Sequence, residues 1–440
     1  MSSTIRNDYL DRLLQGHDAL PAASSAWMHK LRMRAVERAN ELTVPTTRDE
    51  EWRFTDLAPL YKLPFRPATV PGTVEASRLD PYAIPEAGIR LVFVDGRYSP
   101  SLSRFAPMEG VAVGNLADVG ARTGSVAESR LSQLALFEND AFVAVNTAFL
   151  GDGATVHVSR DVKAAAPIHL LFVATQKDIA SYPRVLVVAE SGAECTVVED
   201  FIGLADGPYL TDAVSEVFIA GNAQVAHVRL QRETPTAFHI ATTAVSVARD
   251  GHYSSWTISL GARISRQNLN IGQDGEGTEF SVDGLTLIGG RQLADTHSSI
   301  DHAHAHGKSR QLHKTIVGGG AHAVFNGKIL VREGAQQTDS GQQSRSLLLS
   351  DKARVDAKPQ LEIFADDVKC AHGATVGQIE ADELFYLKSR GLDDAVARNL
   401  LTYAFAAEII ERIPVRSVVG KLEQHVLEQT QSESTQSRQA

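Results

Sequence analysis

The segment FSVDGLTLIGG, residues 280–290, carries the pattern that decides the fold. Apolar and polar residues alternate at its start and two glycines end it, as in a strand with one buried face that runs into a turn. Similar short runs bounded by Gly, Asp or Asn recur between residues 150 and 370: TVHVS (155–159), RVLVVAES (184–191), AQVAHVRLQ (223–231), KILVREG (328–334) and PQLEIFADD (359–367). Many short strands separated by turn signals predict an all-β region.

The breaks between these strands recur at a loose interval. SGA begins at residue 191, GNA at 221, RDG at 249 and QDG at 273, a spacing of roughly 24 to 30 residues. In a solenoid each coil exposes an apolar face and backbone edges that only the next coil covers, so the coils must stack. The interval favours a β-helix, and a β-sandwich is the alternative that periodicity leaves open.

The residue pattern changes from strand-like to helical on both sides of this region. Residues 1–90 read as two helices, near 4–15 and 25–43, followed by a proline-rich connector. We therefore divide the chain into a helical region and connector at 1–90, a β-helix core at 91–377, a C-terminal helical domain at 378–427 and a tail at 428–440. The tail has no apolar cluster to bury and is expected to be disordered.

The C-terminal helical domain contains two predicted helices. Gly391 separates them, and Pro414 ends the second. The second helix carries one apolar stripe at steps of three and four residues, formed by Val396, Leu400, Tyr403, Ala407 and Ile410. Such a stripe either packs back on the β core or docks another protein.

Composition limits the classes of function. The formal charge is −10, with acids and bases intermingled and no basic stripe, so nucleic acid is not expected as a partner. The start of the chain shows no targeting signal, and no stretch approaches the roughly 20 apolar residues of a membrane span, so we expect a soluble, cytoplasmic protein. The two cysteines, Cys195 and Cys370, cannot build a disulfide framework or a closed zinc finger from this chain alone.

The segment DDVKCAHGATVGQ, residues 366–378, places Cys370 two positions before His372. On an extended strand this spacing points both side chains to one face, and thiolate and imidazole suit iron, copper or zinc. Two ligands are too few for a tight closed site, so the pair would need a second chain or would bind only transiently. The alternative is a buried free cysteine beside a turn histidine.

The segment DHAHAHGKS, residues 301–309, places His302, His304 and His306 at alternate positions. On a strand they would share one face and form a weak candidate metal site, and an exposed polar face explains the same pattern. No Ser/His/Asp or paired-carboxylate arrangement stands out, so we do not expect catalysis by this chain.

Several segments together resemble the SufB/SufD family of iron–sulfur cluster assembly proteins. They are EEWRFTDL (50–57), SRQLHK (309–314), VFNGKILV (324–331), SLLLSDKARVDAKPQLEIFADDVKCAHGATVGQ (346–378) and LFYLKSRG (384–391). The form CAHGATVGQ and the scarcity of cysteine are more similar to the SufD branch than to the SufB branch. The resemblance implies a right-handed parallel β-helix flanked by helical regions, in a non-catalytic scaffold subunit.

The resemblance also implies partners. It predicts a SufBCD complex in which SufB pairs with this chain through the ends of the two β-helices and the ATPase SufC binds the C-terminal helices. Residues of the SufC-binding region would include Leu384, Phe385, Tyr386, Leu387, Arg390 and Gly391. His372 would lie at the SufB interface and take part in forming a transient cluster, or in holding iron shared with SufB, while Cys370 could be structural.

Some properties stay open at this level. The resemblance does not say whether a flavin docks on the complex or whether the isolated chain forms a homodimer, and no cofactor is expected to bind the lone chain tightly. Two other classes of function remain as alternatives: a stand-alone metal-binding protein that uses the histidine triplet, and a carbohydrate-active β-helix. The second needs aromatic platforms for sugar rings, and aromatic residues are only 6% of the chain.

Overall fold

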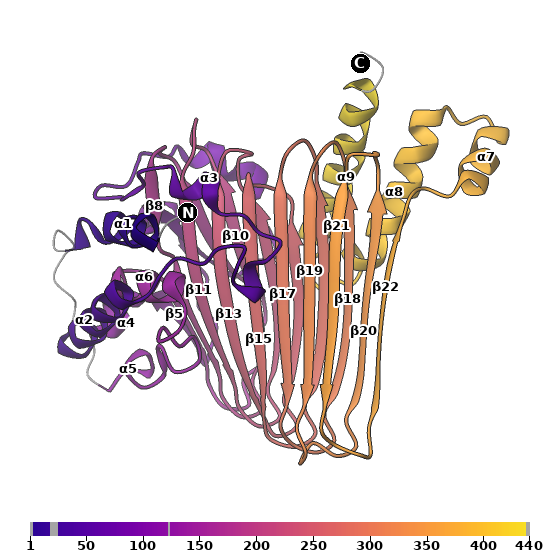
Figure 1. Cartoon of the computed structure of the whole chain (residues 1–440). Coiled ribbons are helices and arrows are strands. Elements are labelled where there is room, and N and C mark those ends of the chain that lie inside the picture. Colours follow the sequence, from indigo (N-terminus) through magenta and orange to yellow (C-terminus); the bar gives the residue numbers. More distant parts are fainter. Residues whose placement is uncertain (1–2, 18–24, 122–123, 437–440) are drawn as a thin grey trace.

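The computed structural model describes residues 3–17, 25–121 and 124–436 and shows a parallel β-solenoid with helices at both ends (Figure 1). Successive strands alternate between two sheets, so each coil of the solenoid adds one strand to each sheet. The mainly β, β-helical fold predicted from the alternating runs is confirmed, and the β-sandwich alternative is wrong.

The strands of the two sheets are named here in their spatial order. The first sheet contains β21 (Arg354–Ile363), β19 (His322–Val331), β17 (Leu293–His302), β15 (Ile264–Asp274), β13 (Phe238–Ala248), β11 (Leu210–Ile219), β9 (Arg184–Ala189), β6 (Ala154–Val158) and β5 (Val111–Asn115), with β8 (Ile179–Ser181) paired to β11 and β1 (Arg66–Pro67) paired to β8. The second contains β22 (Lys369–Gly377), β20 (Asp339–Leu348), β18 (Lys308–Val317), β16 (Glu279–Ile288), β14 (His252–Ser259), β12 (Gln224–Arg232), β10 (Glu194–Gly203), β7 (Ile168–Ala174), β2 (Ile89–Val94) and β3 (Arg97–Tyr98), with β4 (Arg104–Phe105) paired to β2.

The coils stack in register. Paired residues of neighbouring coils lie 27 to 31 positions apart along the chain, as the pairs between β12 and β22 show. At one corner each coil turns through a residue with positive φ, and its N–H donates to a carbonyl of the next coil, as in Gly192 to Gly221, Asn222 to Arg249 and Asp250 to Glu276. These turns are the SGA, GNA and RDG breaks of the sequence, and Gly and Asn tolerate the left-handed conformation best.

The N-terminal coils contain a large apolar cluster in their interior. Phe93, Phe172 and Phe201 lie on three neighbouring strands and stack with ring centroids 5.1 and 4.8 Å apart. Cys195 is buried in the same cluster, and burial raises the pKa of its thiol to about 12. This cysteine is therefore a core residue held as a neutral thiol.

Helices cover the N-terminal end of the solenoid. They are α1 (Ser3–Leu14), α2 (Ala26–Glu41), α3 (Ala58–Tyr61), α4 (Leu116–Gly120), α5 (Val126–Arg130) and α6 (Ala141–Ala148). The first two match the predicted helices, but α4 to α6 lie inside the range 91–377 that we assigned to the β-helix. The reason is that the chain enters the solenoid at β2, leaves it as a helical insertion and returns at β6. Every residue of α6 is buried, so its mostly apolar sequence shows the same pattern as a buried strand.

The C-terminal helices lie beside the last coils. They are α7 (Ala381–Ser389), α8 (Asp394–Ile410) and α9 (Arg416–Gln436). Helices α8 and α9 pack on the outer face of the second sheet, where Ile409, Ile410 and Val418 meet Leu285 and Leu312. Helix α9 continues past residue 427 into the segment expected to be disordered, and residues 437–440 lie outside the described residues. None of the described helices is both long and apolar enough to cross a membrane.

Candidate functional site

Cys370 and His372 both lie on β22, the last strand of the second sheet. This strand pairs with β20 on one side, and in the described structure its other edge has no strand beside it. In register, Cys370 lies beside Ser340 and His372 beside Gln342, so the two side chains share one face of the strand. His372 is exposed and Cys370 is half-buried. The strand therefore presents His372 at the open end of the solenoid.

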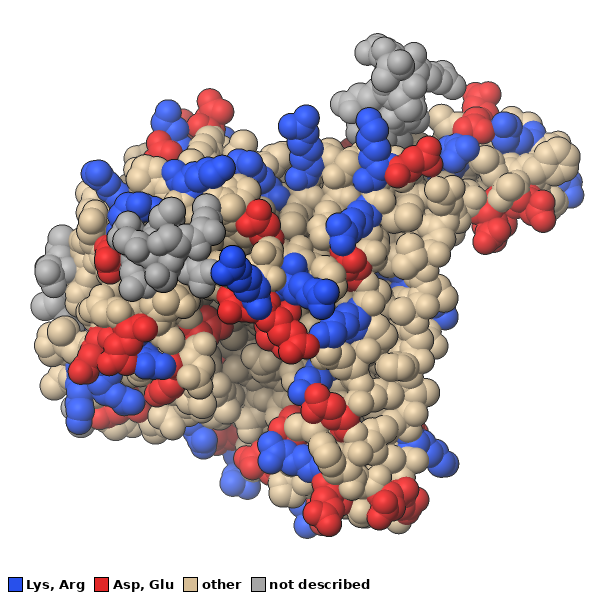
Figure 2. Space-filling model, in the orientation of Figure 1, with Lys and Arg blue, Asp and Glu red and all other residues tan. Residues whose placement is uncertain are grey.

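The open end, defined here as β21 and β22, is a surface suited to another protein. Both strands end their sheets and expose free backbone N–H and C=O groups, which a further strand can pair. Three large apolar side chains on these strands or directly after β21 are also exposed: Ile363 at 40%, Phe364 at 64% and Val376 at 50%. Figure 2 shows charges of both signs interspersed over the molecule, while the flank formed by the last coils is mostly uncharged.

His372 also lines a groove of about 650 Å³ between the second sheet and α8. Glu408 and Arg412 of α8 form one wall, and Asp283 of β16 lies opposite. Burial raises the pKa of Asp283, although Arg412, with both guanidinium contacts at 3.3 Å, opposes this. Lys314 fixes the helix by donating to the Phe405 carbonyl oxygen at 2.8 Å. The groove thus links His372 to the C-terminal helices.

The two halves of the Cys-x-His pair have different surroundings. Cys370 packs against the buried cluster of Ile329, Val331, Ala335 and Ala365. Desolvation raises the pKa of its thiol above the ordinary value, which disfavours the thiolate that a metal needs. His372 is the more accessible ligand of the two.

The three histidines of the DHAHAH segment are not brought together. His302 is the last residue of β17 and is buried, with Nε2 2.9 Å from the Ser309 hydroxyl. His304 and His306 follow the end of the strand and are exposed, and His306 has a φ of 61° in the turn ladder. Within the described residues, no group of three His, Cys, Asp or Glu side chains is arranged to hold a metal. The shared strand face that we predicted for this triplet does not exist.

The apolar stripe of α8 is divided between two surroundings. Ala407 and Ile410 are buried against the solenoid, while Val396 and Leu400, nearer the start of the helix, are 50% and 43% exposed. The interpretation that the stripe packs on the β core therefore holds for the end of the helix, and docking of another protein at its exposed start stays a prediction.

Helix α7 buries no residue and extends away from the sheets (Figure 1). Phe385 and Tyr386 are 75% and 57% exposed, whereas Leu384 and Leu387 are half-buried. Arg390 is exposed and lies over the Tyr386 ring at 5.2 Å, and Gly391 has a φ of 94° just after the helix. With the exposed start of α8, this helix forms a second apolar surface.

The segment EEWRFTDL, residues 50–57, is a strap that lies on the outer face of the first sheet. Arg266 of β15 donates to the backbone oxygen of Glu51 at 2.6 Å, and its guanidinium lies 3.8 Å from the centre of the Trp52 ring. Lys358 Nζ of β21 donates a hydrogen bond to Glu50 Oε1 at 2.9 Å. The strap thus connects the N-terminal region to the last coil, which sequence reasoning did not show.

A buried ionic network fastens this strap. The Asp295 carboxylate accepts hydrogen bonds from Arg266 at 2.6 Å and from the Thr55 hydroxyl at 2.5 Å, and lies 3.1 Å from His297. Burial alone would raise the pKa of Asp295, but Arg266 and then His297 outweigh it and lower the pKa to about 2. Burial alone would lower the pKa of His297, but Asp295 and Glu51 outweigh it and raise the pKa.

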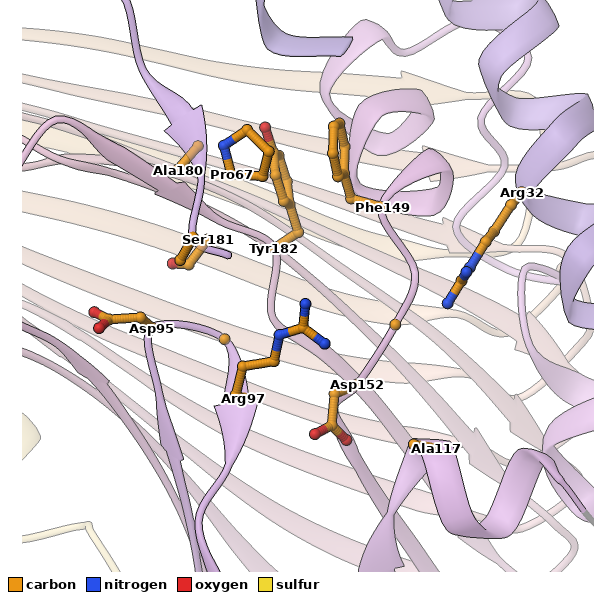
Figure 3. Close-up of a pocket in the computed structure, with 13 residues that line it drawn as sticks. Arg32, Pro67, Asp95, Arg97, Ala117, Phe149, Asp152, Ala180, Ser181 and Tyr182 are labelled. Atoms are coloured by element: carbon orange, nitrogen blue, oxygen red, sulfur yellow. The ribbon is translucent and has the colours of Figure 1, made fainter. Parts of the chain in front are cut away.

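A pocket of about 160 Å³ lies near the N-terminal end of the solenoid (Figure 3). Its carboxylates already accept backbone N–H groups: Asp95 accepts from Gly72 and Thr175, and Asp152 from Tyr98 and Gly153. These two carboxylates therefore serve to join loops, and the open end remains the candidate functional site.

Comparisons with known proteins identify the relatives of this chain. The family model described as "SUF system FeS cluster assembly, SufBD core domain" matches residues 172–405, and the model "SufBD protein N-terminal region" matches residues 3–170. An iron–sulfur cluster assembly SufBD family protein of Synechocystis is 41% identical over 407 residues, which cover 90% of this chain and 89% of the relative. The iron–sulfur cluster assembly protein SufD of Escherichia coli is 33% identical over 412 residues, which cover 90% and 94%. SufD of Bacillus subtilis is 26% identical over 438 residues, which cover 95% and 96%.

Proposed function

The chain belongs to the SufBD family of iron–sulfur cluster assembly proteins, and from this premise we propose that it is the SufD-type scaffold subunit of a SufBCD complex. In this role it supplies surfaces and a ligand for cluster building and catalyses no reaction by itself. Because the chain belongs to this family, we prefer the scaffold role to both alternatives, the stand-alone metal-binding protein and the carbohydrate-active β-helix.

The partner at the open end is proposed to be SufB. Two unpaired edges and the exposed side chains of Ile363, Phe364 and Val376 support this, because a second solenoid end can pair the edges and bury the apolar groups. Strand pairing across the junction would continue the stacking of coils from one chain into the other.

The cluster site is proposed to lie at this junction, with His372 as the contribution of this chain. One imidazole is too few for a stable site, so the remaining ligands, thiolates above all, would come from SufB. The iron or transient cluster is cargo, and the lone chain would hold none tightly. Cys370 is the weaker candidate because it is half-buried with a raised pKa.

The ATPase SufC is proposed to bind α7 and the start of α8. The exposure of Phe385, Tyr386, Val396 and Leu400 supports this surface, since aromatic and aliphatic side chains anchor most protein interfaces. The groove that His372 shares with Glu408 and Arg412 would link movements of these helices to the cluster site. The complex is expected in the cytoplasm.

The exposure of His372 on the last strand is the observation that carries this proposal, and it defines the experiment. Complexes of wild-type and His372→Ala chains with SufB and SufC are purified, and cluster is reconstituted anaerobically with iron and sulfide. His304→Ala is the matched control, because His304 is also exposed but lies on a solenoid turn. We expect His372→Ala to assemble normally and build little cluster by absorption and iron content, with the control unchanged. Equal cluster formation in all three would refute the role of His372.

A further inference from the structure

The interior of the last coils holds a row of polar side chains. Gln342 Nε2 donates to Gln311 Oε1 at 2.7 Å. Gln311 Nε2 in turn donates to Ser298 Oγ at 2.5 Å and to His313 Nε2 at 3.0 Å. Burial lowers the pKa of His313 to about 3, so its ring is neutral and can accept this hydrogen bond. All four side chains are at most 5% exposed, so they form a hydrogen-bonded chain inside the solenoid.

Two strand glycines make room for this chain. A Cβ at Gly327 would lie 2.3 Å from Gln342 Nε2, and one at Gly284 would lie 2.3 Å from His313 Nδ1. Glycine weakens a strand unless a close approach requires it. The polar row is thus accommodated by the backbone on both sides.

The hydrogen-bonded row of side chains ends at Gln342 of β20, one strand before β22. Gln342 Oε1 is buried and has no hydrogen-bond partner in the described structure. Such an acceptor is costly to leave unpaired. The next residue in the same register row is His372 of β22.

Register partners on this face are within reach of one another. Gln311 and Gln342 are paired in neighbouring strands, and their amides meet at 2.7 Å. His372 occupies the same position one strand further on. Adjacent parallel strands are separated by about 4.8 Å, so an imidazole there lies within reach of the Gln342 amide.

We propose that Gln342 is a positioning residue for His372, whose ring donates a hydrogen bond to the free Gln342 Oε1. The hydrogen bond fixes one tautomer and turns the other ring nitrogen, with its lone pair, toward the open end. The inference rests on the proposed role of His372 in cluster formation, and it names the group that orients this ligand. Histidine ligands commonly donate their second ring nitrogen to a carbonyl or carboxylate in this way.

The test begins with the lone chain, so that it is independent of cluster chemistry. Wild-type and variant chains that contain 15N-labelled histidine are compared by NMR. The signals missing from His372→Asn are assigned to His372. In the wild type one tautomer should predominate about tenfold, as expected for one net hydrogen bond. Gln342→Met, which is similar in shape but offers no acceptor, should abolish that preference. Gln342→Glu, which keeps an acceptor oxygen, should retain it.

A matched control lies at the next position of the same strand. Gln343 points to the opposite face, where its register partner is Gly373, so Gln343→Met should leave the His372 signals unchanged. Unchanged His304 signals would show that Gln342→Met still folds. A His372 tautomer ratio equal in wild type and Gln342→Met would overturn the proposal.

The second stage uses the complex with SufB and SufC. Cluster formation should slow about 10-fold or more in Gln342→Met and recover in Gln342→Glu, as for other groups that orient a metal ligand. If His372→Ala builds cluster normally, the proposed function fails. The hydrogen bond between Gln342 and His372 is then still decided by the tautomer ratio measured in the lone chain. If His372→Ala is deficient and Gln342→Met is normal in both stages, only the positioning role is refuted.

Discussion

Replacing Asp295 by Asn should loosen the strap of residues 50–57. The carboxylate pairs with Arg266 inside the protein, and both side chains are at most 2% exposed. A carboxyl whose pKa falls from its ordinary value near 4 to about 2 contributes about 2.5 kcal/mol to stability at neutral pH. The substitution removes that contribution and leaves a buried guanidinium without its charged partner, so a loss of about 2.5 to 4 kcal/mol is expected.

Asp301→Asn is the matched control, since Asp301 lies on the same strand and also pairs with an arginine. Its partner Arg332 is 59% exposed, and exposed pairs contribute about 0 to 1 kcal/mol. Hydrogen exchange of the strap, read by mass spectrometry, should become about 70-fold faster in Asp295→Asn, the factor that corresponds to 2.5 kcal/mol. Urea unfolding gives the global value. Equal strap exchange in the two variants would refute the reasoning.

Three further predictions concern other parts of the molecule. The carboxylates beside His297 raise its pKa in the folded protein. The stability that His297 contributes is therefore complete below pH about 6.5 and is lost as the pH rises through the raised pKa. Hydrogen exchange of the strap, corrected for intrinsic rates, should be slower at pH 6 than at pH 8.5. Phe385→Ser should weaken SufC binding about 30-fold by calorimetry with no change in the chain's own Tm, whereas Val70→Ser, an exposed apolar control, should not. Gly319→Ala should cost about 1 to 3 kcal/mol in urea unfolding, because its Cβ would lie 2.8 Å from the Gly290 nitrogen at a φ of 58°.

Each of these predictions has a result that would contradict it. Strap exchange that is equally fast or slower at pH 8.5 would exclude His297 as its titrating group. Unchanged SufC affinity in Phe385→Ser would remove α7 from the docking surface. A Gly319→Ala chain as stable as wild type would show that the turn tolerates a side chain.

The fold was predictable because its signals are local. Strand alternation such as that in residues 280–290 and the recurring turn residues encode a coil, and stacking follows from the need to cover its faces. The helical insertion was not predictable, because residues 141–148 are buried on all sides and mostly apolar, and so resemble a buried strand in sequence.

The candidate site was predictable only in part. Cys370 and His372 share a strand face, as their spacing indicated, but nothing local shows that β22 is the last strand or that Cys370 is half-buried. The row from Gln311 to Gln342 spans 31 residues and becomes visible only through the register. His306 was misread because β17 ends at His302 and the chain then turns.

The most direct test of the proposed interface is hydrogen exchange of this chain, alone and in complex with SufB. If SufB docks on the open end, amides of β21 and β22 should become strongly protected, because their free edges gain partners, while β14 and β15 in the middle of the sheets should not change. A stable complex in which β21 and β22 exchange as fast as in the lone chain would contradict the assignment of the open end as the SufB interface.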